Sequence, residues 1–174
     1  MIIRQANTAD TGAICAIWNG IVRDTDITFT TVEKSDAEIA ADIAARGTAW
    51  LVAEEGDQVI GFATYGPFRG GPGYAHTMEH SIHLAPAARG LGAGRALMER
   101  LEQVARAEGV HVLVAGISGT NPGAVAFHAR LGFEEVGRMP QVGRKGGEWL
   151  DLLLMQKILG HEGDTGPDSA TASG

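Results

Sequence analysis

A glycine-dense turn, Arg89-Gly90-Leu91-Gly92-Ala93-Gly94, is the feature of this sequence that most restricts its fold. The strand-like run 78–84 precedes it, and an amphipathic helical stretch, 95–108, follows it with apolar positions at Leu97, Leu101, Val104 and Ala105. A strand that leads through such a turn into a helix presents bare backbone amides at the positive end of the helix dipole, where a phosphate binds well. The pattern therefore predicts an α/β domain with an anion site at this turn. The alternative is that the glycines only make a tight connection.

Two common nucleotide-binding motifs do not match the turn. The dinucleotide fingerprint requires glycine where Arg95 stands, and the P-loop requires a Gly-Lys-Ser/Thr triplet that the chain lacks. The anion site therefore belongs to a different class of cofactor.

The remaining segments supply the other elements of an α/β domain. Helical spacing of Ile14, Ile17, Trp18 and Ile21 predicts a first helix, and Ser35-Asp36-Ala37-Glu38 is a capping box that opens a second one. Asn121-Pro122 supplies the N-cap and first turn of the last helix. The expected strands are 1–5, 49–53, 59–65, 78–84, 110–117, 133–137 and 149–155. We expect one α/β (α+β) domain, residues 1–159, with a mixed, mostly antiparallel central sheet flanked by about four helices, and a flexible C-terminal tail, 160–174.

Composition narrows the class of protein. The 174 residues are 44% hydrophobic and 20% charged, which is typical of a single soluble domain. No apolar run is long enough to span a membrane and no signal peptide is evident, so we expect a cytoplasmic protein. Cys15 is the only cysteine, which excludes an internal disulfide and argues against a cysteine-based metal cluster. The net charge of -7 argues against broad nucleic-acid binding.

Several motifs together resemble those of the GNAT superfamily of N-acetyltransferases, over roughly residues 1–158. Arg89, Gly92 and Gly94 match its signature Arg/Gln-x-x-Gly-x-Gly/Ala after a strand. Asn121, His128 and Leu131-Gly132-Phe133 fall where the superfamily carries an Asn, an aromatic or His, and a Gly-Phe pair. Within the superfamily, further tracts are similar to the phosphinothricin and methionine sulfoximine (L-amino acid) acetyltransferases: Glu79-His80-Ser81, Gly143-x-Lys145 and Trp149-Leu150-Asp151.

The resemblance implies acetyl-CoA as co-substrate, no metal, direct transfer in a ternary complex and a possible homodimer. It places the backbone groups of Ile82 and Leu84, with His83 between them, beside the pantetheine amides, and it places Asn121 on the pantetheine arm. It assigns the pyrophosphate to the turn formed by Arg89, Gly90, Leu91, Gly92, Ala93, Gly94 and Arg95.

Acyl transfer to an amine requires removal of a proton from the nitrogen. Glu79 is the candidate base, because burial beside the thioester would raise its pKa toward the working range. It could instead be a structural carboxylate. His128 is the candidate acid for the leaving thiolate, with a water, a strand amide near Ile82 or a purely structural helix histidine as alternatives.

Arg69 is the candidate cation for an acceptor carboxylate, and Tyr74, Trp18 and Lys145 are further candidates for the acceptor pocket. The aromatic residues could equally belong to the core, and Arg69 could be solvated. His76, His80 and His83 raise a metal alternative, which alternating strand positions disfavour. Departures from the subfamily pattern leave the acceptor open: Gly70, Gly71, Ala75, Gly146 and Glu148.

We therefore expect a cytoplasmic acetyl-CoA-dependent N-acetyltransferase that acts on a small amino acid or analogue and binds neither nucleic acid nor membrane. Alternatives are acetylation of peptide or protein N-termini or another amine class, a non-catalytic CoA-binding module, and a ping-pong route through Cys15.

Overall fold

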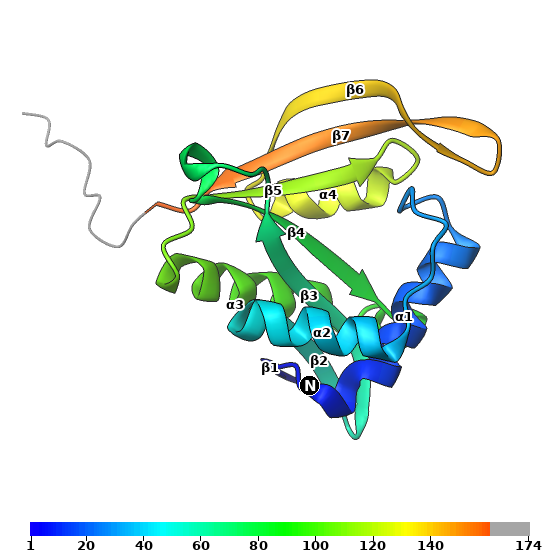
Figure 1. Ribbon diagram of the computed structural model, residues 1–174, viewed down its shortest axis with the longest axis vertical. Helices are drawn as coiled ribbons and strands as arrows, with labels where there is room; N and C mark the ends of the chain where they lie inside the picture. Colours follow the sequence, from blue (N-terminus) through cyan, green and yellow to red (C-terminus); the bar gives the residue numbers. More distant parts are fainter. Residues whose placement is uncertain (161–174) are drawn as a thin grey trace, which may run out of the picture.

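One seven-stranded sheet forms the centre of the molecule, with strand order β1-β2-β3-β4-β5-β7-β6 (Figure 1). The computed structural model describes residues 1–160. Within them the strands are β1 (Ile2–Gln5), β2 (Trp50–Glu55), β3 (Gln58–Pro67), β4 (Thr77–Leu84), β5 (Val112–Ser118), β6 (Glu134–Lys145) and β7 (Glu148–Ile158). Only β4 and β5 pair in parallel, so the sheet is mixed and mostly antiparallel, as the sequence predicts.

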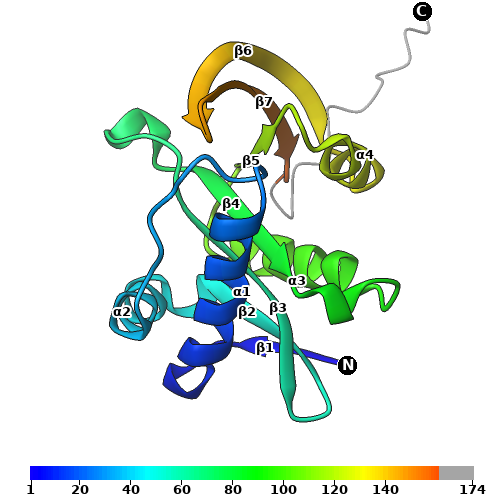
Figure 2. The ribbon, with the colours of Figure 1, turned by 90° about the vertical axis from the view of Figure 1, so that its right-hand side faces the viewer.

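Four α-helices cover the two faces of the sheet: α1 (Thr11–Asp24), α2 (Asp36–Arg46), α3 (Ala93–Ala107) and α4 (Pro122–Arg130). Figure 2 shows α1 and α2 on one side of the sheet and α3 and α4 on the other. The order of helices and strands in the described residues is the one that the sequence predicts. None of these helices is long and apolar enough to cross a membrane.

Local capping chemistry sets two of the helix starts. The Ser35 hydroxyl accepts a hydrogen bond from the Glu38 amide, while the Glu38 carboxylate accepts one from the Ser35 amide, which completes the predicted capping box of α2. The Asn121 side chain accepts from the Ala124 amide and starts α4. Both predictions from the sequence are confirmed.

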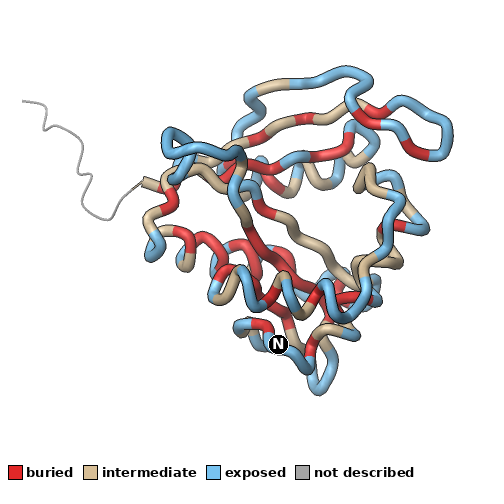
Figure 3. The backbone as a smooth tube through the Cα atoms, in the orientation of Figure 1, coloured by how far each residue is buried: buried red, intermediate tan, exposed pale blue. Residues whose placement is uncertain are grey.

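Each face of the sheet has its own apolar cluster. Figure 3 shows, in red, that buried residues are concentrated in the central strands and in α3. On the α3 side, Leu97, Met98 and Leu101 are fully buried against residues of β2, β3 and β5. On the other side, Ile14 of α1 and Ile39 of α2 pack on Trp50, Val52 and Phe62. Burial of these side chains, about 2 kcal/mol for each Leu or Ile, keeps the central strands rigid.

The last hairpin is longer than the sequence predicts. The expected strand 133–137 extends to Lys145 as β6, and the expected strand 149–155 extends to Ile158 as β7. Pairing of β6 with β7 shifts register between Met139 and Gly143, where Pro140 interrupts the run and Gln141 has a φ of 54°. The bulge breaks the two-residue periodicity, which is why the pattern stops at Gly137. Gly146 (φ 58°) and Gly147 (φ 86°) form the connecting turn.

The two central parallel strands pair over only four residue positions, from Thr77 with Val112 to His80 with Ala115. Beyond His80, β4 continues to Leu84 without a paired strand on that side, while β5 continues along β7. The sheet therefore opens between β4 and β5. The predicted tail, 160–174, lies outside the described residues apart from Gly160, so the boundary at residue 159 stays a prediction.

Candidate active site

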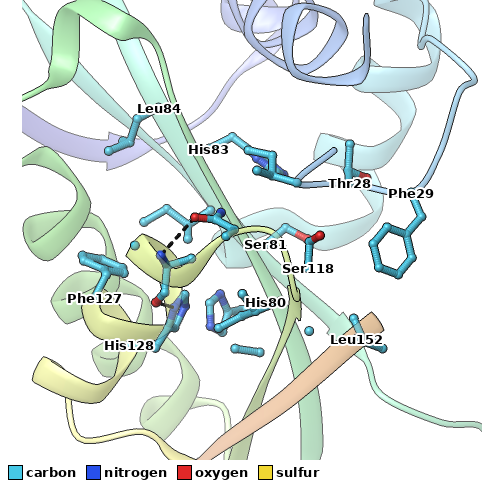
Figure 4. Close-up of a pocket in the computed structure, with 18 of the residues that line it drawn as sticks. Thr28, Phe29, His80, Ser81, His83, Leu84, Ser118, Phe127, His128 and Leu152 are labelled. Carbon is cyan, nitrogen blue, oxygen red and sulfur yellow. Dashed lines mark hydrogen bonds between the residues drawn. The ribbon is translucent and has the colours of Figure 1, made fainter. Parts of the chain in front are cut away.

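The opening between β4 and β5 contains a cavity of about 750 Å³. In Figure 4, Leu84 and Phe127 lie at one end of it, and Thr28 and Phe29 lie at the other. His128 lies beside Phe127, and the His80 ring stacks on it in the lower part of the view. The cavity thus joins the region of the glycine turn to the segment between α1 and α2.

Backbone groups of β4 face this cavity. The Thr77 carbonyl accepts from Phe68, and the Ala85 amide donates to Ile60, so the odd-numbered residues of this stretch direct their backbone groups toward β3. Because successive residues of a strand alternate, Ile82 and Leu84 direct their amides and carbonyls toward the opening. They lie beyond the last β4–β5 pair and can bind the amides of an extended ligand.

The glycine turn ends at the start of α3 in the conformation expected for an anion site. Gly90 and Gly92 have φ values of 78° and 75°, and Gly92 is the N-cap of α3 without a side-chain hydrogen bond. The first amides of the helix have no acceptor within it and are available to a phosphate. A Cβ at Gly94 would lie 3.3 Å from Leu84 and from the Phe127 ring, so only glycine lets α3 approach so closely. Arg89 lines the cavity.

Arg95, at the end of the predicted turn, does not line the cavity. Its guanidinium forms an ion pair with Glu99 one turn along α3, at 2.9 Å, on the helix surface. Nothing in this geometry directs Arg95 toward the cavity.

Glu79 lies on the wall of the cavity at the point where the strands separate. Its carboxylate rests over Gly116 of β5, where a Cβ would be 2.8 Å from Oε1. Although the side chain is exposed, the surrounding protein partly desolvates it and raises the pKa of its carboxyl. No hydrogen bond or ion pair to it is found among residues 1–160, so it is free to accept a proton from a bound amine.

His128 is buried on α4, and its hydrogen bond determines its tautomer. Nδ1 lies 2.7 Å from the Ala124 carbonyl oxygen, which can only accept, so Nδ1 carries the proton. Burial lowers the pKa of His128, so the ring is neutral near pH 7 and Nε2 presents a lone pair. A neutral His128 can therefore act only as an acceptor through Nε2, which is buried and has no hydrogen-bond partner among residues 1–160. The expected role as acid would require a second proton, which burial disfavours.

His80 stacks on His128 with ring centroids 5.1 Å apart, and burial lowers the pKa of His80 to about 3. His83 lies on the opposite face of β4, between Trp18 and Phe62, with centroid distances of 5.1 and 5.3 Å, and burial lowers its pKa to about 4. The two histidines point in opposite directions, as strand alternation predicts. No group of three or more His, Cys, Asp or Glu among the described residues is placed to hold a metal ion.

Three predicted acceptor residues do not line the cavity. Arg69 lies over the Phe68 ring at 5.5 Å, and Phe68 in turn contacts Tyr74, with ring centroids 6.5 Å apart. These residues belong to the loop between β3 and β4, at the end of β4 that pairs with β5. Lys145 donates hydrogen bonds to backbone carbonyls of the chain itself. Trp18, by contrast, lines the cavity, as do Glu79, Asn121 and His128.

Several cavity residues were not anticipated from the sequence: Ile27, Thr28, Phe29, Thr30, Gly116, Phe127 and Leu152. The segment 27–30 has no periodic pattern and only long-range packing brings it here. Gly116 did carry a signal, because a glycine inside an otherwise apolar strand often marks the close approach of another group.

Comparison with known proteins is consistent with this geometry. The family model described as Acetyltransferase (GNAT) family matches residues 17–133. An L-methionine sulfoximine/L-methionine sulfone acetyltransferase of Pseudomonas aeruginosa is 42% identical, over 90% of this chain and 94% of its own length. The L-amino acid N-acyltransferase MnaT of Escherichia coli is 41% identical, over 97% and 99%. The structure of a phosphinothricin acetyltransferase of Sinorhizobium meliloti in complex with acetyl-CoA superposes with a TM-score of 0.87 at 35% identity, over 98% and 95%.

Proposed function

Since the chain belongs to the GNAT acetyltransferase family, we propose that it transfers the acetyl group of acetyl-CoA to the amine of a small amino acid or amino-acid analogue. The observation that carries this proposal is the cavity between β4 and β5. The glycine turn, the backbone groups of Ile82 and Leu84 that pair with no strand, and the unpaired carboxylate of Glu79 all lie around this cavity. The relatives named above act on such acceptors, which supports the choice of acceptor class.

Acetyl-CoA binding uses backbone groups in this proposal. The amides at the start of α3, with Arg89 beside them, bind the pyrophosphate, and the glycines from Gly90 to Gly94 allow its close approach. The Ile82 carbonyl and the backbone groups of Leu84 pair with the pantetheine amides, and Asn121 lines the path of the pantetheine arm. This arrangement directs the thioester toward Glu79, where β4 and β5 separate.

The acceptor reacts by direct attack in a ternary complex. Glu79 takes a proton from the ammonium, the neutral nitrogen bonds to the thioester carbon, and the C–S bond breaks as the tetrahedral intermediate collapses. The amide of Ile82 faces the opening and can stabilise the oxyanion. Because neutral His128 presents a lone pair, the leaving thiolate takes its proton from water in this proposal.

The acceptor end of the cavity has aromatic walls formed by Trp18, Phe29 and His83. They suit the apolar part of an amino-acid side chain. Arg89 is the one Lys or Arg among the described residues that line the cavity, and it belongs to the cofactor end. Arg69 remains our candidate for the acceptor carboxylate from the family resemblance, with Tyr74 beside it, and replacement of Arg69 by Ala tests it through the acceptor KM.

The first test of the proposal follows CoA thiol release with acetyl-CoA across free amino acids, methionine sulfoximine, phosphinothricin and short peptides. We expect kcat/KM on a free amino acid or analogue to exceed that on the peptides. A preference for peptides would reassign the acceptor class. No release above hydrolysis, together with acetyl-CoA binding by calorimetry, would indicate a CoA-binding module.

The direct mechanism is tested at Cys15. Its thiol is buried on α1, donates a hydrogen bond to the Lys34 carbonyl at 2.9 Å and does not line the cavity. We expect Cys15→Ala to retain wild-type turnover and to form no acetylated protein with acetyl-CoA alone. Loss of turnover in a folded Cys15→Ala variant would favour a ping-pong route.

The same proposal includes a cytoplasmic homodimer that uses no metal and binds neither nucleic acid nor membrane. A net charge of -7 supports the exclusion of nucleic acid. Light scattering after size-exclusion chromatography measures the oligomeric state, and activity after treatment with a chelator tests for a metal.

A further inference from the structure

The segment 25–34, which joins α1 to α2, forms the far wall of the cavity, although it contains neither helix nor strand. Figure 2 shows it rising from the end of α1 toward β6 and β7 before it returns to α2. Its residues Thr28 and Phe29 face the cavity in Figure 4. The position of this wall determines the space left for an acceptor.

The far end of the segment is held by α1. The Asn19 side chain accepts from the Lys34 amide at 2.9 Å and donates to the Lys34 carbonyl at 2.8 Å. Between Thr25 and Val32, the hydrogen bonds within the segment are only short-range contacts to the hydroxyls of Thr25 and Thr30. These cannot determine where residues 26–31 lie relative to the sheet.

Lys145, at the end of β6, supplies the missing long-range contacts. Its Nζ donates to the Thr25 carbonyl at 2.7 Å and to the Thr28 carbonyl at 2.9 Å. The side chain is only 9% exposed, and it forms no ion pair among residues 1–160. Burial of an ammonium group costs free energy unless its protons are hydrogen-bonded. Movement of the Thr25 and Thr28 carbonyls away from Lys145 would leave its buried charge without these partners and is therefore unfavourable.

Gly143, two residues earlier on the same face of β6, is the second contact. It is buried beneath Phe29, and a Cβ there would lie 2.6 Å from ring atom Cε2 and 2.7 Å from Cγ. These separations are too short for carbon atoms, so any side chain at position 143 would displace the ring. Lys145 thus holds the backbone of the segment, and Gly143 leaves the space that the Phe29 ring occupies.

We propose that Gly143 and Lys145 are positioning residues that set the size and shape of the acceptor end of the cavity through segment 25–30. Neither residue touches the acceptor. Lys145 acts by hydrogen bonds to Thr25 and Thr28, and Gly143 acts through Phe29. The proposal rests on the proposed function, since it concerns the acceptor end of the same cavity.

Steady-state kinetics of Lys145→Met test the first contact. The variant keeps the length of the side chain and removes its donors, so the wall loses its position while the acetyl-CoA end is unchanged. We expect the acceptor KM to rise about tenfold or more, with the acetyl-CoA KM within about twofold of wild type. Arg144→Ala is the matched control, because Arg144 is exposed between the two residues with its guanidinium over the Trp149 ring. An unchanged acceptor KM in Lys145→Met, or equal losses for both substrates, would overturn the proposal.

A double-mutant cycle tests the second contact. Gly143→Ala in the wild-type background should raise the acceptor KM, since the methyl group displaces the Phe29 ring. In a Phe29→Ala background the same change should have almost no effect, because the ring is gone. Persistence of the full Gly143→Ala effect without Phe29 would show that Gly143 acts by another route and would contradict the proposal.

Hydrogen exchange of the full chain keeps this test separate from that of the proposed function. Lys145→Met should increase amide exchange in segment 25–31 and leave the Ala93–Ala107 helix as protected as in wild type. Unchanged exchange in 25–31 would refute the role of Lys145 whatever the activity. If wild type shows no turnover but the exchange result is as expected, the proposed reaction fails and the positioning role stands.

Discussion

Glu79 and His80 are consecutive on β4, so their side chains lie on opposite faces of the strand and in different surroundings. Glu79 reaches across Gly116 at the wall of the cavity, while His80 packs on His128 of α4. The exposed carboxylate of Glu79 can take up a proton only when it is ionised. The buried imidazoles are neutral, and the Ala124 carbonyl sets the tautomer of His128. The surroundings of each side chain thus explain why Glu79 is the candidate base and why the two histidines are neutral.

Replacement of Glu79 by Gln removes the proton acceptor and keeps the shape of the side chain. We expect kcat to fall about a hundredfold or more, with the acetyl-CoA KM little changed. The base works when deprotonated and its pKa is raised, so wild-type kcat/KM should increase with pH through the titration of Glu79. That acidic limb should disappear in Glu79→Gln. Full activity in the variant would remove Glu79 from the mechanism.

Replacement of His128 by Phe tests whether the imidazole protonates the leaving thiolate. General acids contribute about a hundredfold or more, whereas a neutral ring that is protonated at Nδ1 has no proton to donate from Nε2. We therefore expect kcat to fall less than about tenfold, with thermal unfolding measured in parallel to detect any loss of packing. A drop of a hundredfold in a folded variant would restore His128 as the acid.

At the level of the secondary-structure elements, the junction of the glycine turn with α3 is separate from β4, the strand that carries Glu79. Gly92 adopts a left-handed conformation that orients the first amides of the helix. Gly109, just beyond the other end of α3, has nearly the same φ, 78° against 75°. A Cβ at either position would meet nothing within 4 Å. Substitutions at these two glycines therefore cause similar backbone strain, and a difference in cofactor binding between the two variants would come from the position of Gly92.

Gly92→Ala and Gly109→Ala should each destabilise the fold by about 1–2 kcal/mol, since both place a Cβ in the left-handed region. Only Gly92→Ala should weaken acetyl-CoA binding, by about tenfold, because strain relief there turns the helix amides away from the pyrophosphate. Calorimetric titration with acetyl-CoA and urea unfolding measure the two effects. Equal losses of affinity in both variants would mean that the turn has no special role.

At the scale of the whole molecule, the buried histidines couple folding to pH. The pKa of His80 is lowered to about 3 and that of His83 to about 4, against about 6.5 for a histidine in the unfolded chain. Below pH 6.5 the unfolded state binds more protons than the folded state. The free energy of unfolding therefore falls as the pH decreases from 6.5 toward the folded pKa values.

Each of these histidines contributes a slope of at most about 1.4 kcal/mol per pH unit in that window. Urea unfolding at pH 7.5 and pH 5 should show lower stability at pH 5, and His80→Phe should reduce the difference. The ion pair of Asp10 with Arg4 lowers the pKa of that carboxyl, so its contribution is lost only at more acidic pH. An unchanged pH dependence in His80→Phe would contradict the assignment.

The features that could be predicted from the sequence are those that depend on local interactions. The capping box at Ser35, the cap at Asn121, the amphipathic period of α3 and the left-handed glycines act over a few residues. The order of elements and the glycine turn before α3 can therefore be predicted without a fold. Glu79 and His128 were singled out by their match to family motifs, and both line the cavity, while their catalytic roles are predictions.

The rest of the cavity is formed by contacts between segments that lie far apart in the sequence. The early end of β4–β5 pairing opens the sheet, and Phe29 reaches Gly143 from more than a hundred residues away in the chain. Arg69 and Tyr74 lie in a loop outside the cavity, and Lys145 bonds to the chain itself. Such contacts depend on packing between elements distant in sequence, for which no local period or cap exists.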